Sequence, residues 1–108
     1  MSMREQTYLV LLALADGPRH GYAVLNAVGE LSAGRVTIGP GTLYGALDRL
    51  VAEELVEVSG AEVVNGRHRR YYRLTGKGAD AITSETARLS ALAAKARRVV
   101  ARLGLSGA

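Results

Sequence analysis

The feature that most constrains the fold of this chain is a long amphipathic pattern at its C-terminal end. Apolar residues recur there every seven positions, at Ile82, Leu89, Ala96 and Leu103. Leu92 and Val99 lie between them at the same spacing, and Glu85 interrupts this inner row. We therefore predict one helix that follows Thr75, its N-cap, and ends near Leu103. About 28 residues at 1.5 Å each make a rod about 40 Å long, which extends beyond any domain that residues 1–75 can build.

Residues 1–75 predict a small domain that contains three helices. The first spans residues 4–15 and is ended by the segment Asp16-Gly17-Pro18. The second spans residues 20–31 and carries an apolar face formed by Tyr22, Leu25 and Val28. Residues 36–38 predict a short strand. Pro40 then opens the third helix, in the first-turn position that proline tolerates. The apolar stripe of this helix is Leu43, Leu47, Leu50 and Val51.

A β-hairpin is predicted after the third helix. Residues 55–58 alternate around Glu57 as a half-buried strand does. Asn65-Gly66 then predicts a two-residue turn, because both residues accept the positive φ angles that such a hairpin requires. The returning strand spans Arg67 to Leu74. Along this strand the side chains alternate between the two faces of the hairpin.

The order helix, helix, short strand, helix and hairpin is that of a winged helix. The predicted fold class is therefore mainly α with a small β-hairpin wing, a winged helix-turn-helix followed by a long C-terminal helix. We expect residues 1–75 to bind DNA and residues 76–108 to form a dimerisation helix. The third helix would enter the major groove by its N-terminus, where free N–H groups and the positive dipole end favour phosphate.

The charges of the chain are segregated along the sequence. The net charge is +4, and twelve of the fourteen basic residues are arginine. Residues 67–77 contain five basic residues and no acid, whereas residues 53–62 contain four acids and no base. Arginine suits bidentate contacts with phosphate, so the basic returning strand favours a nucleic-acid partner. Two other interpretations stay open: a GC-rich genome, and a solvated edge that prevents strand aggregation.

Composition argues against several other classes of protein. The chain has no Cys, and its two histidines, His20 and His68, are far apart, so we expect no metal site and no cofactor. No Ser/His/Asp or paired-carboxylate set is present, and the short Gly-rich segments lack the spacing of a phosphate-binding loop. We therefore predict that the protein is not an enzyme. No apolar run approaches the ~18 residues of a membrane span, and residues 1–6 do not resemble a signal peptide. A cytoplasmic protein is expected.

Several blocks of the sequence together resemble the short members of the PadR family of bacterial transcriptional regulators. The blocks are His20-Gly21-Tyr22, Pro40-Gly41-Thr42-Leu43-Tyr44 with Leu47, Arg49 and Leu50, Gly66-Arg67, Arg69 to Thr75, and Gly78. The resemblance covers roughly residues 5–103. It implies a repressor released by a small apolar or aromatic effector, and a homodimer that forms through the last helix. As a two-fold dimer, it would bind an inverted-repeat operator in double-stranded DNA.

The candidate site residues follow from these blocks. The expected DNA contacts are His20, Pro40, Gly41, Thr42, Tyr44, Arg67, Arg69 and Arg70. The expected dimerisation residues are Leu89, Leu92, Ala96, Val99 and Leu103. For His20, a helix-start residue without a role is an equal alternative. Tyr22 and Tyr72 are interpreted as core residues.

The sequence also departs from the family pattern at the end of the third helix. Glu54 stands where the family usually has glycine, and a left-handed cap is costly for Glu. We therefore expect this helix to end in another way. Alternatives for the whole chain are a winged-helix module that binds protein instead of DNA, a regulator of another winged-helix family, and an RNA-binding protein.

Overall fold

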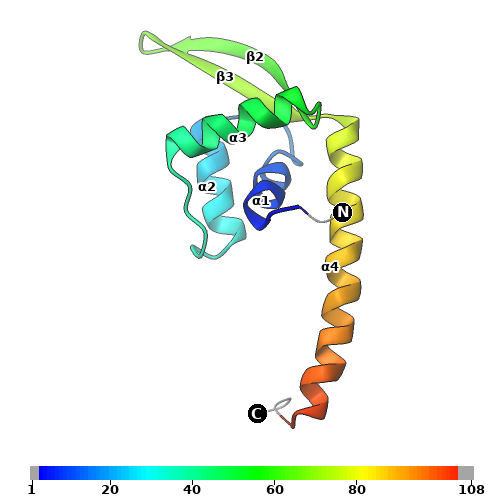
Figure 1. Cartoon of the computed structure of the whole chain (residues 1–108). Helices are drawn as coiled ribbons and strands as arrows, with labels where there is room; N and C mark the ends of the chain where they lie inside the picture. Colours follow the sequence, from blue (N-terminus) through cyan, green and yellow to red (C-terminus); the bar gives the residue numbers. More distant parts are fainter. Residues whose placement is uncertain (1–2, 105–108) are drawn as a thin grey trace.

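The computed structural model describes residues 3–104 and confirms the predicted fold class (Figure 1). Its elements, within these residues, are α1 (Glu5–Ala13), β1 (Arg19–His20), α2 (Gly21–Leu31), α3 (Pro40–Ala52), β2 (Val56–Val64), β3 (Arg67–Leu74) and α4 (Gly76–Arg102). We call residues 3–75 the head and α4 the rod. The head packs its helices beneath the hairpin, and the rod runs down one side and continues well past it (Figure 1).

The head has an apolar core of its own. Side chains from all three helices and both long strands are less than 2% exposed there, namely Val10, Leu11, Leu14, Val24, Val28, Leu43, Leu47, Leu50, Val56 and Tyr72. The predicted stripe of α3 and the core position of Tyr72 are thereby confirmed.

The predicted core position of Tyr22 is wrong. This side chain is 66% exposed, and the buried side chains of α2 are Val24, Ala27 and Val28. The reason is geometric, because Tyr22 lies two residues before Val24 and so points about 200° away from it around the helix. The spacing of three that joins Tyr22 to Leu25 and Val28 selected a face rotated from the buried one.

The short strand also lies elsewhere than predicted. The sheet has the order β1-β3-β2, with Arg19 opposite Tyr72 and His20 opposite Tyr71. Residues 36–38 belong to no strand. One edge of β3 pairs with β2 along the hairpin, and β1 occupies the other edge directly before α2. The free edge of β3 is thus taken by the segment that precedes α2 instead of the one that follows it.

The predicted two-residue turn of the hairpin is confirmed. Asn65 and Gly66 have φ angles of 51° and 77°, the positive pair that a two-residue turn of this type requires. The returning strand β3 has the predicted bounds, whereas β2 extends six residues beyond the predicted strand, to Val64. An irregularity between Val58 and Gly60 shifts the register in the middle of the wing.

The end of α3 corrects the expectation for Glu54. Glu54 adopts the left-handed conformation, with φ of 64°. Its N–H donates to the carbonyl of Val51 at 3.0 Å, and the N–H of Leu55 donates to that of Leu50 at 3.0 Å. These two bonds are the Schellman pattern that usually ends on glycine. The helix therefore ends as in the family, although a Cβ in this conformation costs roughly 1–2 kcal/mol.

Tertiary contacts explain why this costly cap persists. Thr75, the confirmed N-cap of α4, donates its hydroxyl to the Glu54 carbonyl at 2.6 Å and accepts from the Gly78 N–H at 3.0 Å. Lys77 Nζ donates to the Glu53 carbonyl at 3.0 Å. A Cβ at Gly78 would collide with the Leu55 carbonyl oxygen. The first turn of the rod is therefore bonded to the end of α3, which joins head and rod at a fixed place.

Beyond this junction most residues of the rod are exposed. Its buried residues are Gly78 and Glu85. Glu85 is 4% exposed and pairs with Arg88 through two hydrogen bonds, Nε to Oε1 at 2.9 Å and Nη2 to Oε2 at 2.7 Å. These bonds lower the pKa of Glu85 below its ordinary value. The charged residue that interrupts the apolar row is thus accommodated against the head as an ion pair.

Candidate nucleic-acid interface

The first turn of α3 is open to solvent. Gly39 is the N-cap and contributes no side-chain hydrogen bond, and Pro40 follows as the first helical residue. Residues 39–42 are all exposed. The N–H groups that every helix leaves unpaired at its start are therefore surrounded by little side-chain bulk, and they form a positive helix end that a phosphate or a base edge can approach.

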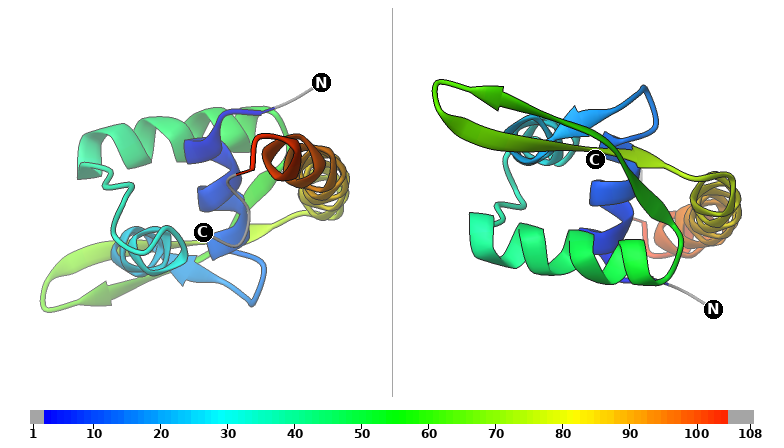
Figure 2. Two further views of the ribbon diagram at one scale, coloured as in Figure 1. Left: turned by 90° about the horizontal axis from the view of Figure 1, so that it is seen from below. Right: turned by 90° about the horizontal axis from the view of Figure 1, so that it is seen from above.

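The wing extends to the same end of the molecule. In two views at right angles, the N-terminus of α3 and the tip of the β2–β3 hairpin both lie at the end of the head farthest from the rod (Figure 1; Figure 2, right). Seen from above, the wing and α3 diverge from the C-terminal end of α3 (Figure 2, right). A large ligand that approaches the head from the side away from the rod can therefore meet both the wing and the start of α3, where Pro40, Gly41 and Thr42 are exposed (Figure 1).

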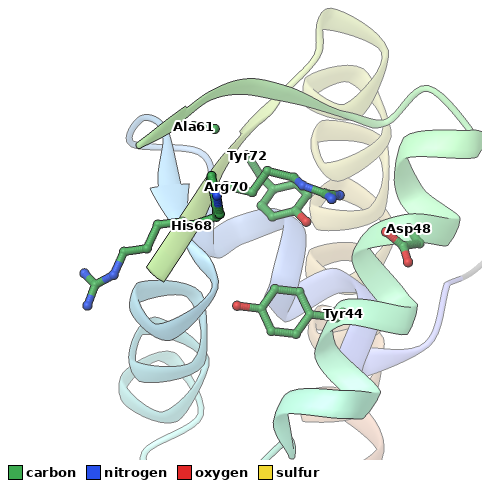
Figure 3. A pocket seen from close by; sticks show the side chains of 7 residues that line it. Tyr44, Asp48, Ala61, His68, Arg70 and Tyr72 are labelled. Carbon is green, nitrogen blue, oxygen red and sulfur yellow. The ribbon is translucent and has the colours of Figure 1, made fainter. Parts of the chain in front are cut away.

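An open groove lies between α3 and the wing. Its volume is about 630 Å³, and it is lined by Tyr44, Asp48, Ala61, His68, Arg69, Arg70 and Tyr72. Figure 3 shows Tyr44 and Asp48 on α3 facing the wing strand that carries His68 and Arg70. Tyr72 is only 1% exposed and closes the bottom of the groove. The structure thus brings three predicted contacts, Tyr44, Arg69 and Arg70, into one groove.

The acids of β2 are already engaged by the strand beside them. Glu57 pairs with Arg73 Nε at 2.6 Å, and Glu62 accepts a hydrogen bond of 2.5 Å from Tyr71. The bond to Glu62 raises the pKa of the Tyr71 phenol, because ionising it would place two anions side by side. Within residues 3–104 the ion pairs are Arg73–Glu57 and Arg88–Glu85. Arg67, Arg69 and Arg70 therefore hold their charges without a carboxylate partner in the described part of the chain.

His20 lies at the junction of β1 and α2, outside the groove. Its Nδ1 accepts from the N–H of Ala23 at 3.4 Å, which makes it the N-cap of α2. Its ring meets that of Tyr71 edge-on, with centroids 5.6 Å apart. With Nδ1 accepting, the neutral ring carries its proton on Nε2, which remains a donor. His20 therefore has a structural role, and its contact with DNA stays a prediction.

Sequence reasoning missed three polar residues near this surface. Asp48 and His68 line the groove, and Tyr22 is exposed in the first turn of α2. The sequence could have indicated two of them. Asp48 lies one helical turn after Tyr44 and so shares its face. His68 lies two residues before Arg70 on β3 and so shares the face of Arg70. The exposure of Tyr22 depended on how α2 rotates against the core and had no local signal.

Residues 3–104 contain no group of three or more His, Cys, Asp or Glu placed to hold a metal ion. None of the helices there has the length and the apolar character needed to cross a membrane.

These features define a class of protein. A helix with a bare, exposed N-terminus, supported by two other helices and flanked by a basic hairpin, is a winged helix. The chain belongs to the PadR-like family of transcriptional regulators, whose family model matches residues 10–84. It is a family of regulators and not of enzymes, as the sequence predicted.

Two relatives illustrate the match in sequence. A transcriptional regulator of Mycobacterium tuberculosis is 42% identical over 84 residues, which are 78% of this chain and 75% of that protein. An uncharacterized 37.1 kDa protein in transposon Tn4556 of Streptomyces fradiae is 54% identical over 56 residues. Those residues are 52% of this chain but only 16% of the transposon protein.

Solved structures agree with the fold. A PadR-like transcription factor of Bacteroides fragilis has a TM-score of 0.73 and 28% identity, over 87% of this chain and 88% of that one. PadR of Bacillus subtilis, solved in complex with operator DNA, has a TM-score of 0.66 and 20% identity. That match covers 75% of this chain and 46% of the other.

Proposed function

We propose that this protein is a homodimeric repressor that binds an inverted repeat in double-stranded DNA and is released by a small apolar or aromatic effector. The observation that carries the proposal is the groove that Tyr44 of α3 shares with Arg69 and Arg70 of the wing, two arginines without a carboxylate partner within residues 3–104. The B. subtilis PadR solved with operator DNA has the same fold, which supports DNA as the ligand.

The roles divide between the helix and the wing. Thr42 and Tyr44, exposed in the first turns of α3, would read base edges in the major groove. Arg67, Arg69 and Arg70 would neutralise phosphates, which positions the protein without reading sequence. Nε2 of His20 would donate to a phosphate beside α2. Residues 1–75 would thus form the DNA-binding part and residues 76–108 the dimerisation part.

The wing provides the decisive test. Replacing Arg67 and Arg69 together with Ala should weaken binding to all duplexes alike. It should also reduce the slope of log affinity against log salt by about 1.8, because each lost phosphate contact contributes about 0.9. The control is Arg97→Ala with Arg98→Ala, which removes the same charge from the exposed rod. Fluorescence anisotropy over a salt series measures both quantities. An unchanged slope in the wing variant would refute phosphate binding by these arginines.

The nature of the ligand is tested by competition. The protein should retain sequences selected from random duplex DNA and should prefer them to single-stranded RNA of the same sequence. Preference for the RNA would support the RNA-binding alternative. Binding to neither, with a folded protein, would support a protein-interaction module.

The dimer is inferred from the far part of the rod. Leu92, Val99 and Leu103 are 54%, 46% and 65% exposed, although they form one stripe with Leu89 and Ala96. A second copy would cover this stripe. Two-fold symmetry would then place two α3 helices about one DNA turn apart, which requires an inverted repeat.

The effector would lodge where α1 and α4 of the two subunits meet. Tyr8 on α1 and Thr86 on α4 share a hydrogen bond of 2.6 Å between their hydroxyls. A shallow hollow of about 490 Å³ lies on α4 beside them and includes Ile82, Thr86 and Ala87. The small side chains of Ala93 and Ala96 leave room further along the rod. Chemical-shift mapping with a panel of aromatic compounds tests this placement, and shifts confined to the wing would contradict it.

A further inference from the structure

The ring of Tyr44 lies directly against the backbone of Gly21. Gly21 is the first residue of α2 and is buried. A Cβ built on it would lie 2.7 Å from Cζ and 3.1 Å from Cε1 of Tyr44, with the hydroxyl nearer still. Real Cβ atoms do not approach other atoms this closely, so a Tyr44 ring in this position is compatible only with glycine at residue 21.

This close approach is specific to Gly21 among the glycines of α2 and α3. A Cβ on Gly29 in α2, or on Gly41 or Gly45 in α3, would meet no atom within 4 Å. Gly21 also has no positive φ angle, so the backbone conformation itself does not require glycine there. What residue 21 must provide is space for the Tyr44 ring.

The ring occupies a position that matters for recognition. Tyr44 is 44% exposed and lines the groove together with Asp48 and Arg70 (Figure 3). One end of the ring therefore rests on α2 while the rest faces the groove. A Cβ at residue 21 would displace the ring, because Tyr44 is a flexible side chain and can yield without moving α3.

We infer that Gly21 is a positioning residue for Tyr44, and that it sets the orientation in which Tyr44 reads DNA. The inference rests on the proposed function and extends it to a buried residue that acts through Tyr44. It predicts that Gly21→Ala preserves the fold but reduces the discrimination between DNA sequences. The affinity for unrelated duplex should change little, because the wing arginines are untouched.

The experiment compares two identical substitutions in α2. Gly21→Ala and Gly29→Ala are each titrated against a duplex selected from random sequence and against a scrambled duplex of the same composition. Gly21→Ala should reduce the ratio of the two affinities about 5-fold or more, the low end of what one base contact contributes. Gly29→Ala should leave the ratio within twofold. Both variants should unfold in one cooperative thermal transition, and Gly29→Ala, in the interior of α2, should raise its midpoint because alanine favours a helix.

A double-mutant cycle shows whether Tyr44 is the mediator. In a Tyr44→Ala background there is no ring to displace, so Gly21→Ala should have no further effect on the ratio. Tyr44→Phe keeps the ring and should remain sensitive to Gly21→Ala. If Gly21→Ala reduces the ratio equally with and without the Tyr44 ring, the inference is wrong and another contact of α2 is responsible.

NMR of the free protein checks the geometry without DNA. The chain has five tyrosines, so ¹³C-labelled ring signals can be assigned one by one. Gly21→Ala should shift the Tyr44 signals most. Shifted Tyr44 signals with an unchanged affinity ratio would overturn the inference and leave the proposed function intact. A folded protein that binds no duplex at all would overturn the proposed function, and the inference would fall with it.

Discussion

The head and the rod show two different ways in which apolar residues are used. In the head, side chains from α1, α2, α3 and the sheet pack against one another, and many of them are completely buried. In the 27 residues of the rod only Gly78 and Glu85 are buried, and both lie in its first half. The same stripe continues through the second half, where Leu92 and Val99 are 54% and 46% exposed.

The difference teaches that one periodic pattern can serve two interfaces. Glu85, Leu92 and Val99 are seven residues apart and share one side of the helix. At Glu85 this side faces the head, and at Leu92 and Val99 it has no cover within residues 3–104. The molecule measures 59 × 27 × 21 Å, because the rod extends past the head. The head therefore holds a core of its own, while the exposed stripe of the rod is the surface that the proposed dimer would cover.

The largest expected effect comes from placing charge on the exposed stripe. Leu92→Glu with Val99→Glu should abolish the dimer, because each buried Leu or Val contributes about 1.5–3 kcal/mol and like charges would face each other. Light scattering should then give the mass of a single 11.4 kDa chain. Circular dichroism measures the fraction of the variant that is unfolded.

The control for this variant uses the opposite side of the rod. Ala94→Glu with Ala101→Glu adds the same charges at the same spacing, roughly 180–200° around the helix from Leu92. This control should remain a dimer. A single-chain mass for the unmodified protein at micromolar concentration would contradict the proposal that a second copy covers the exposed stripe of the rod.

A cavity in the head should have the next largest effect. Leu50 is completely buried, so Leu50→Ala should reduce the free energy of unfolding by about 2–5 kcal/mol. Leu31→Ala, at a side chain that is 52% exposed, should stay within about 0.5 kcal/mol. Urea denaturation measures both values. If the head is complete by itself, Leu50→Ala should cost a similar amount in a folded monomeric variant, and a loss confined to the dimer would argue against a separate core.

A smaller effect, of opposite sign, is expected at the junction of head and rod. Glu54→Gly should raise the free energy of unfolding by about 1 kcal/mol, because glycine adopts the left-handed conformation without strain. Glu53→Gly, one residue earlier at φ of −83°, should reduce stability by roughly 0.5–1 kcal/mol. Thermal unfolding of the two variants should therefore move in opposite directions. Equal shifts would mean that the strain at Glu54 has little effect.

The smallest effect concerns the place where the rod meets the head. The pKa of Glu85 is lowered, chiefly by its hydrogen bonds from Arg88, so folding favours the ionised carboxylate. The stability that this contributes is present above the unfolded pKa, about 4.3, and is lost as the pH falls through the folded value. Glu85→Gln should therefore destabilise the protein near neutral pH, with a difference that disappears in acid. Glu30→Gln, at an exposed carboxylate, provides the control. A difference that grows in acid would contradict the ion pair.

Most of the elements could be predicted because their signals are local. Pro40 opens α3, Asn65-Gly66 forms the turn of the wing, and Thr75 caps α4. Each of these residues acts through its own backbone preference or a bond to a neighbour a few positions away. The DNA-contact candidates on α3 and the wing came from the sequence blocks that resemble the PadR family, and the structure brings Tyr44, Arg69 and Arg70 into one groove.

The errors concern features that depend on distant parts of the chain. The short strand β1 lies at Arg19–His20, where it pairs with the edge of β3 that β2 leaves free. No pattern within residues 36–38 reveals this pairing. Glu54 takes a strained conformation because Thr75 and Lys77, more than twenty residues later, bond the carbonyls at the end of α3.

The sequence by itself determined the kinds of element, their order and the basic character of the wing, since these follow from periodicity, caps and charge. Only the tertiary structure decided three features: which side of α2 is buried, the contact of the Tyr44 ring with Gly21, and the point along the rod beyond which its apolar stripe is exposed. The physical reason is range. Backbone preferences act over a few residues, whereas burial and close contact depend on which segments the whole chain brings together.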